Sequence, residues 1–280
     1  MRHDLLALTL LLLFCPIGIA AQSLDQDLIE AAKDGDAALV ESLLDRGAHI
    51  DAVNKDRRTA LIRAAFRGHV QVIRVLVDAH ADLNLRDVQG HTALSWAAHE
   101  GCVEVAQILL ESGANPNTRD EDLYTPLIWA AFKGHTEIVE SALRFGADPK
   151  ARNNSGFTPL IRAAQQGHVD IARLLIAAHS DVNARNQHGY SALMRAVEHG
   201  HTEIVTLLLA SGASLNAQNN YGHTALNRAA DKGQLDVVQQ LLNAGADPKI
   251  ADKRGRTALE MAQLGNHADV VALLKSVSAK

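Results

Sequence analysis

Short apolar segments alternate with polar, glycine-containing turns along most of the chain. In residues 59–79, the first apolar segment holds the pair Ala64-Ala65, and the second, 70–77, has the spacing that buries one face of a helix. Gly68 separates the two segments, because glycine readily adopts backbone conformations outside the helix. The pattern predicts two short helices joined by a tight turn.

This two-helix unit repeats every 33 residues without a slip. Its start is marked by a Thr/Ser-Ala/Pro-Leu triplet at Thr59-Ala60-Leu61, Thr92-Ala93-Leu94, Thr125-Pro126-Leu127, Thr158-Pro159-Leu160, Ser191-Ala192-Leu193, Thr224-Ala225-Leu226 and Thr257-Ala258-Leu259. A glycine column with the same period comprises Gly35, Gly68, Gly101, Gly134, Gly167, Gly200 and Gly233, with Asn266 in the next place. Thr and Ser cap helices, and Pro is tolerated in a first helical turn. We therefore expect about eight units, of which the first and last act as polar caps.

The Thr-Pro-Leu, Ala-Ala, Gly-His and Gly-Ala-Asp blocks of these units resemble the signature of the ankyrin repeat, and the resemblance covers about residues 24–280. It implies an all-α solenoid of helix-turn-helix units with β-hairpin-like tips, which works as a protein-binding scaffold. Two tips depart from the family pattern, because Arg57 and Leu123 replace the tip glycine. A non-glycine residue at positive φ costs about 1 kcal/mol, so we expect these two tips to be reshaped. His80 and His179 replace a helix-ending glycine and are expected to be locally strained.

The first 21 residues differ from the rest of the chain. A basic start, an apolar run over residues 5–14 and small residues at Ala20 and Ala21 predict a secretory signal peptide, residues 1–21. An uncleaved membrane anchor is the alternative, although the run is shorter than the roughly 20 residues of a membrane span. We therefore expect a repeat domain over 22–280 that is exported, periplasmic or secreted, without membrane insertion after cleavage. In this it resembles exported bacterial ankyrin-repeat proteins.

Composition leaves a folded, water-soluble protein as the expected class. The chain is 47% hydrophobic and 4% aromatic, and it has 27 basic against 32 acidic residues, a formal net charge of −5. This balance gives no general attraction for nucleic acid, so we expect no nucleic-acid partner. The two cysteines exclude a disulfide framework, and cleavage of the signal would leave Cys102 alone.

Aromatic and basic residues gather on one predicted surface of the repeats. In ankyrin-like units the tips and the exposed side of the first helix form a concave face, with seven positions in each unit. Of the nine aromatic residues after the signal, eight fall on these positions, together with 16 basic but only six acidic residues. Aromatic and arginine side chains dominate binding hot spots, and the arginine fork suits carboxylates. The predicted partner-binding residues are Arg63, Phe66, Arg67, Trp96, His99, Tyr124, Trp129, Phe132, Lys133, Phe157, Arg162, Tyr190, Arg195 and Arg228.

A purely structural role is the competing interpretation for these side chains. Arg195 and Arg228 have acidic residues three positions on, Glu198 and Asp231, with which they can form ion pairs. The arginine column of the tips, Arg86, Arg119, Arg152 and Arg185, can brace neighbouring tip carboxylates. The one-sided charge is explained better by a binding face.

No catalytic, cofactor or metal signature is present in the sequence. His69, His135, His168, His201 and His267 share one column. Stacked helices lie about 8–10 Å apart, which is too far for neighbouring histidines to share a zinc ion with bonds of about 2 Å. We expect these histidines to bond the inter-helix turns, and Cys102 to be an inert buried thiol. We expect no enzyme activity, no cofactor and no metal.

These observations predict a non-enzymatic, exported and monomeric interaction scaffold. Its partner would be an acidic protein, such as an envelope enzyme that it inhibits or protects, bound by the concave aromatic and basic face. The alternative is adhesion to an anionic polymer of the cell envelope.

Overall fold

The computed structural model describes residues 16–278, so most of the predicted signal peptide, 1–21, lies outside the described part. Over that range it contains 16 helices and no strand. Their bounds are α1 Pro16–Asp34, α2 Ala37–Asp45, α3 Ala60–Arg67, α4 Val70–Asp78, α5 Ala93–Glu100, α6 Val103–Glu111, α7 Pro126–Lys133, α8 Thr136–Arg144, α9 Pro159–Gln166, α10 Val169–Ala177, α11 Ala192–His199, α12 Thr202–Ala210, α13 Ala225–Asp231, α14 Leu235–Asn243, α15 Ala258–Leu264 and α16 Ala268–Ser278. The predicted all-α repeat solenoid is confirmed.

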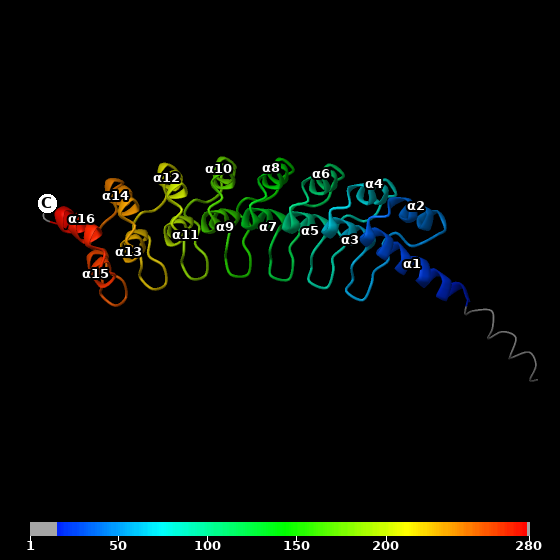
Figure 1. Cartoon of the computed structure of the whole chain (residues 1–280), viewed down its shortest axis with the longest axis horizontal. Helices are drawn as coiled ribbons and strands as arrows, with labels where there is room; N and C mark the ends of the chain where they lie inside the picture. Colours follow the sequence, from blue (N-terminus) through cyan, green and yellow to red (C-terminus); the bar gives the residue numbers. More distant parts are fainter. Residues whose placement is uncertain (1–15, 279–280) are drawn as a thin grey trace, which may run out of the picture. The chain divides into compact units, whose positions relative to one another are not determined.

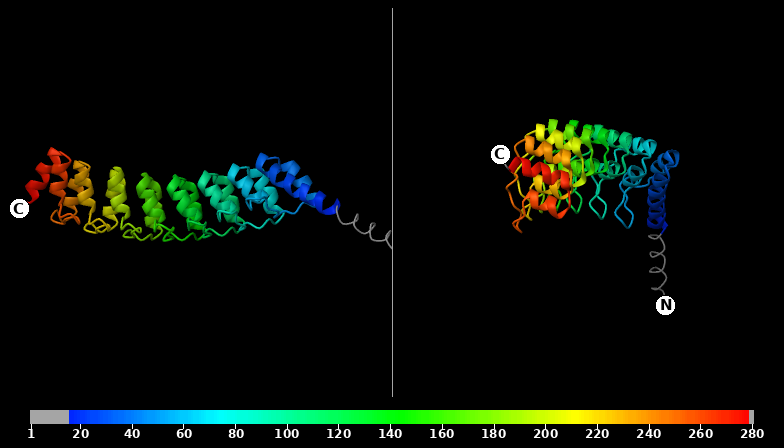
Figure 2. Two further views of the ribbon diagram at one scale, coloured as in Figure 1. Left: turned by 90° about the horizontal axis from the view of Figure 1, so that it is seen from below. Right: turned by 60° about the vertical axis from the view of Figure 1, so that its left-hand side comes forward.

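The chain divides into two compact units, with the boundary between Glu121 and Asp122. Unit 1 holds α1–α6, and unit 2 holds α7–α16. Within each unit the odd-numbered helices pack against one another in one row and the even-numbered helices form a second row (Figure 1). The connecting loops, here called tips, extend from the row of odd-numbered helices, as the view from below also shows (Figure 2).

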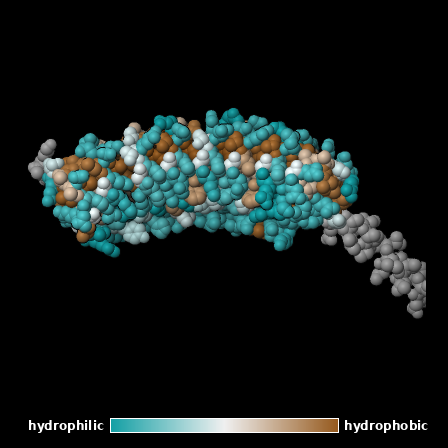
Figure 3. Space-filling model, viewed as in Figure 1, coloured by the Kyte–Doolittle hydropathy of each residue, from teal (hydrophilic) through white to brown (hydrophobic). Residues whose placement is uncertain are grey.

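The repeated residues form the helices in the predicted way. The Oγ1 of Thr59 accepts a hydrogen bond from the backbone N–H of Ile62 at 3.2 Å, which caps α3, and Gly68 ends this helix at φ 75°. Ala64 and Ala65 are fully buried, which lets neighbouring first helices approach closely. Branched side chains of the second helices, such as Ile73, complete the core between the two rows. Apolar residues are visible along the upper part of the molecule in Figure 3.

An Asp or Asn side chain closes the tips, as the bonds of Asn54, Asp87, Asn153, Asn186, Asn219 and Asp252 show. In the tip before α5, Oδ1 of Asp87 accepts from the backbone N–H groups of Gln89 and His91 at 3.0 and 2.9 Å. The N–H of Asp87 donates to the carbonyl of His91, so the tip is hairpin-like. Successive tips are joined by backbone bonds, for example from Val88 N–H to the Asp56 carbonyl at 3.0 Å. The only bridge of β type in the described range is Arg185–Ser191.

The expectation that two tips would be reshaped was wrong. Arg57 and Leu123 adopt positive φ angles of 57° and 59° and occupy the place of the tip glycine. The first of these tips keeps its bonds, because Oδ1 of Asn54 accepts from two backbone N–H groups and Arg57 N–H donates to the Asn54 carbonyl at 2.9 Å. These bonds offset the conformational cost. His80 and His179 also have positive φ, as expected, at 62° and 61°.

Residues of the histidine column tie several repeats to the ones before them. His69 Nε2 lies 2.9 Å from the Lys33 carbonyl, and His201 Nε2 lies 3.1 Å from the Gln165 carbonyl. Gln234 takes the same place in a later repeat and donates to the Val197 carbonyl at 2.8 Å. The predicted bonding role of the column is confirmed at these positions, and the acceptor is the end of the preceding first helix.

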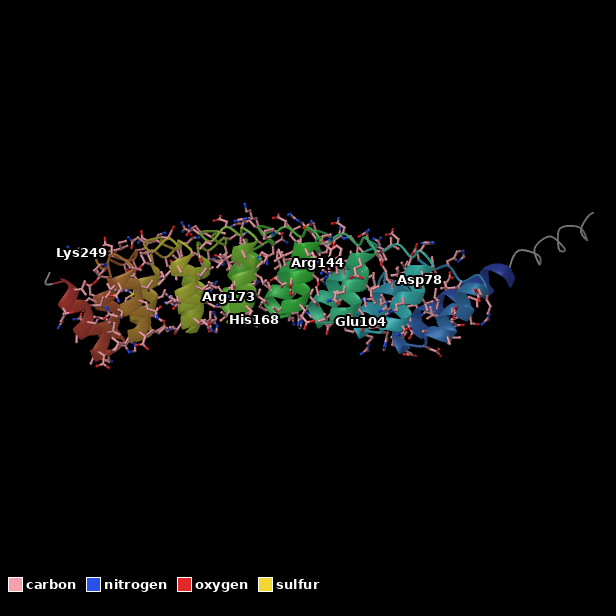
Figure 4. All side chains as sticks on the ribbon, turned by 90° about the horizontal axis from the view of Figure 1, so that it is seen from above. Asp78, Glu104, Arg144, His168, Arg173 and Lys249 are labelled. Carbon is pink, nitrogen blue, oxygen red and sulfur yellow. The ribbon has the colours of Figure 1, made fainter. Side chains whose placement is uncertain are left out.

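The even-numbered helices are more acidic than the odd-numbered helices α3 to α15, whereas α1 is itself acidic, with four acidic residues and one basic residue. From α2 to α16 the even-numbered helices contain eleven acidic and four basic residues. Figure 4 looks onto these helices, where Asp78, Glu104, Arg144 and Arg173 project from α4, α6, α8 and α10. The odd-numbered helices from α3 to α15 contain six basic and four acidic residues.

Candidate partner-binding face

The predicted binding residues all lie on the odd-numbered helices or on the tips before them, which we call the first-helix face of each unit. In unit 1 they are Arg63, Phe66 and Arg67 on α3 and Trp96 and His99 on α5. In unit 2 they are Trp129, Phe132 and Lys133 on α7, Arg162 on α9, Arg195 on α11, Arg228 on α13, and Tyr124, Phe157 and Tyr190 in the tips. The predicted aromatic residues are therefore divided between the units, with Phe66 and Trp96 in unit 1 and Tyr124, Trp129, Phe132, Phe157 and Tyr190 in unit 2.

Trp96 is the centre of the aromatic cluster of unit 1. Its ring and that of Phe66 are nearly perpendicular, with their centroids 5.0 Å apart. The rings of His91 and His99 lie 4.5 and 5.7 Å away. The guanidinium of Arg67 lies 5.4 Å over Phe66. Trp96 is half-buried, so it presents part of its ring to solvent while it packs on its neighbours.

The position of Trp96 is fixed by Asp87, a residue that the sequence did not single out. The Asp87 side chain is fully buried, and its Oδ2 accepts from Trp96 Nε1 at 3.0 Å and from Arg58 Nε at 3.2 Å. The Arg58 guanidinium lies 5.1 Å over the Trp96 ring. One carboxylate thus closes the tip and also orients a ring and a cation. In the sequence, this contact could have been suspected only because the tip residue nine positions before Trp96 is Asp rather than Asn.

Aromatic rings and arginines alternate on the first-helix face of unit 2. Tyr124 and Trp129 stack with centroids 4.2 Å apart. Arg162 lies 3.7 Å over Phe157 and 5.0 Å from the centroid of Phe132, and its NH2 donates to the Tyr124 hydroxyl. Stacking of this kind suits a guanidinium, which is planar and weakly hydrated.

The next arginine continues this arrangement. Arg195 lies 4.0 Å over Tyr190 and 5.6 Å from the centroid of Phe157. Phe157 itself is only 8% exposed, so the prediction that it would offer its ring to a partner was wrong. Its ring lies beneath the two guanidinium groups and supports them.

Glu198 links two arginines of unit 2. Its Oε2 lies 2.7 Å from NH1 of Arg195, and its Oε1 lies 2.9 Å from NH2 of Arg228. NH1 of Arg228 also pairs with Asp231 at 3.1 Å. The two predicted pairs at spacing i, i+3 are therefore present, and Glu198 adds a bond between repeats. The charge of these two arginines is largely satisfied within the chain.

Three further predicted residues make fewer contacts. Lys133 and Arg67 are exposed at the ends of α7 and α3. Arg63 is half-buried, and its Nε has no hydrogen-bond partner within residues 16–278.

The arginine column of the tips bonds to backbone carbonyls. Arg86 donates from Nε to the Gly90 carbonyl at 3.0 Å and from NH2 to the Arg119 carbonyl at 2.6 Å. Arg185 donates to the Gly189 carbonyl at 3.0 Å and to that of Gln218. The expectation that this column braces carboxylates was wrong for Arg86 and Arg185, because each of these two guanidinium groups bridges two carbonyls, and Arg152 donates to the Arg185 carbonyl. Arg86, Arg152 and Arg185 therefore connect successive tips.

The last tips of unit 2 enclose a small basic cavity of about 250 Å³, lined by Tyr221, His223, Asp252, Lys253, Arg254 and Arg256. Burial alone would raise the pKa of Asp252, but hydrogen bonds from Arg256 and Arg254 lower it to about 2. Arg256 NH2 lies 2.7 Å from this carboxylate. The three basic residues are among those counted on the predicted face.

Burial shifts the pKa of two titratable groups in unit 1, His91 and Cys102. Burial lowers the pKa of His91 in spite of the nearby Asp120 and Asp87 carboxylates. Burial raises the pKa of the Cys102 thiol, as does Glu100, which disfavours the thiolate. No group of three or more His, Cys, Asp or Glu side chains that could hold a metal ion occurs between residues 16 and 278. No helix in this part of the chain is long and apolar enough to cross a membrane.

Comparison with known proteins agrees with the architecture. A family model for ankyrin repeats in three copies matches residues 28–120, 119–186 and 178–252. No curated protein matches the sequence significantly. The matched segments span most of the chain and coincide with the helix pairs and tips described above. The chain therefore belongs to the ankyrin-repeat family, whose repeats indicate a protein–protein interaction scaffold.

Proposed function

We propose that this protein is an exported scaffold that binds an acidic protein through its first-helix face, for example an envelope enzyme that it inhibits or protects. One observation carries the proposal. Arginines and aromatic rings gather on the odd-numbered helices and their tips, while the even-numbered helices hold eleven acidic and four basic residues. An acidic surface is attracted to the first face and repelled by the second.

The contacts of the face suit recognition of another protein. Its rings are held in place by neighbouring arginines and by Asp87, so little side-chain freedom is lost on binding. Half-buried tryptophans and arginines are the residue types that contribute most to interfaces. Two such residues, Trp96 and Trp129, anchor the clusters of unit 1 and unit 2.

A matched pair of charge reversals tests which surface binds. Lys133→Glu changes an exposed residue of the first-helix face, and Arg173→Glu makes the same change on α10. Each variant and the wild type are used as bait in an envelope extract, and the captured proteins are identified by mass. We expect Lys133→Glu to lose an acidic protein that Arg173→Glu retains. Equal capture by both variants would place the interaction elsewhere.

The stoichiometry of binding separates a protein partner from an envelope polymer. A protein partner gives a defined ratio in solution, whereas an anionic polymer gives multivalent binding that falls steeply with salt. Export is tested separately by fractionation and by N-terminal sequencing of the protein recovered from the envelope fraction. A mature start near residue 22 is expected, and a start at Met1 in a membrane fraction would contradict it.

A further inference from the structure

One arginine of the unit 2 face differs from its equivalents in the neighbouring repeats. Arg162, Arg195 and Arg228 occupy the same place in α9, α11 and α13. Three residues later, α11 and α13 carry carboxylates that pair with their arginines, but α9 carries Gln165. NH1 of Arg162 donates to the Gln165 side-chain oxygen at 3.2 Å, and NH2 donates to the Tyr124 hydroxyl. Both partners are neutral.

The surroundings of Arg162 make its charge costly. The side chain is half-buried and its guanidinium stacks on the buried ring of Phe157. Its Nε is buried without a hydrogen-bond partner within the described range, as are those of Arg195 and Arg228, but Arg162 has no carboxylate on its other nitrogens there. Burial lowers the pKa of Arg162, which shows that removal from water disfavours the charged form. A partly desolvated charge that lacks a counter-ion interacts strongly with one that is brought to it.

We propose that Arg162 is the anchor for a carboxylate of the bound partner, an Asp or Glu side chain that supplies the negative charge which Glu198 supplies to Arg195. This inference rests on the proposed function. A guanidinium has five N–H donors, and the two bonds to Gln165 and Tyr124 leave others available. The assignment to carboxylate follows from the equivalent sites, where the chain itself uses Asp and Glu.

The aromatic rings next to Arg162 indicate which type of residue neighbours the acidic residue in the partner. Trp129 and Phe132 are half-buried on α7, and their ring centroids lie 6.4 Å apart. Phe132 is also within 5.0 Å of the Arg162 guanidinium. A partner segment could carry an apolar residue next to its Asp or Glu. The apolar residue would then pack on these rings, and the carboxylate would bind Arg162.

The test introduces a carboxylate next to Arg162 by substitution, so that it competes with the carboxylate of the partner. Gln165→Glu reproduces the arrangement of α11 with an almost unchanged side-chain shape, and Gln166→Glu adds the same charge at the adjacent exposed position as a control. The probe is a labelled peptide of alternating Glu and Leu, with a Gln-Leu peptide for comparison, followed by fluorescence anisotropy. We expect Gln165→Glu to weaken binding of the Glu-Leu peptide about tenfold and Gln166→Glu less than about twofold. Thermal unfolding of both variants checks that the fold is retained.

The possible failures are distinguishable. If both variants weaken binding equally, the anchor is wrong, while a loss with Lys133→Glu would still support the acidic-partner face. If neither these variants nor Lys133→Glu changes binding, the proposed function fails together with the anchor. Competition by inorganic phosphate but not by acetate would overturn the assignment to a carboxylate.

Discussion

Glu198 should contribute to the stability of unit 2 more than its surface position in α11 suggests. It bridges Arg195 of its own helix and Arg228 of the next repeat at 2.7 and 2.9 Å. Glu198→Gln keeps the shape of the side chain but removes its charge. The two guanidinium groups then lose a shared carboxylate while they remain packed against their neighbours.

The expected size of the effect follows from exposure. The side chains of Glu198, Arg195 and Arg228 are 19%, 16% and 17% exposed. Exposed ion pairs contribute about 0–1 kcal/mol, whereas removing one partner of a fully buried pair costs about 3–5 kcal/mol. Arg228 retains Asp231, so a loss between these limits, about 2 kcal/mol, is expected. For a domain of this size it corresponds to a fall of roughly 4–8 °C in the unfolding temperature.

Urea and thermal unfolding measure the loss, with Glu203→Gln on α12 as the control because this exposed residue forms no ion pair within residues 16–278. The same variant should bind the Glu-Leu peptide more tightly than wild type, since Arg195 is released from its carboxylate partner while Arg228 retains Asp231. A Glu198→Gln protein that is as stable as Glu203→Gln would show that the bridge contributes nothing. The account of a charge satisfied within the chain would then be incorrect.

Two further substitutions test the packing of the repeats. Gly222→Ala should lower the free energy of unfolding, measured in urea, by about 1–3 kcal/mol more than Gly212→Ala. Both residues have φ near 80°, but only the Cβ added at 222 would meet the backbone N of Lys253, at 2.6 Å. Equal losses of stability would mean that the tips separate freely. Burial lowers the pKa of His168, so the unfolded chain binds the proton more tightly and stability falls as the pH drops below the ordinary histidine value of about 6.5. His168→Gln keeps the bonding capacity that Gln234 shows in the same column, and its unfolding temperature should fall less between pH 7 and pH 5; an unchanged pH dependence would exclude His168 as a cause.

The helix pairs could be predicted from the sequence because their causes are local and repeated. Caps such as Thr59 and left-handed glycines such as Gly68 act within a few residues of themselves. The error at Arg57 arose because the cost of positive φ was considered without the tip bonds that offset it. Those bonds come from Asn54, and its place in a polar turn does not by itself show which backbone N–H groups its side chain accepts from.

The residues of the first-helix face could be predicted from the sequence, but the contacts that their side chains make with one another could not. The helical spacing places Trp96 on this face, whereas its bond to Asp87 depends on the direction of both side chains. Arg86 reaches a carbonyl 33 residues away in the next tip, which no local pattern indicates. Phe157 could be assigned to the correct surface, yet its burial depends on two arginines from successive helices.

The residue three positions after each arginine decides what that arginine can do. In α11 and α13 this residue is acidic, so the guanidinium is bound within the chain and stabilises the stack. In α9 it is Gln165, and the charge of Arg162 is left to act on another molecule. The rings of Trp129 and Phe132 lie on α7, on the side of Arg162 away from the paired arginines. A partner held at Arg162 would therefore gain apolar contact by extending toward α7, whereas extension toward α11 would meet guanidinium groups that already have their carboxylates. This asymmetry gives the unit 2 face a direction along the repeats.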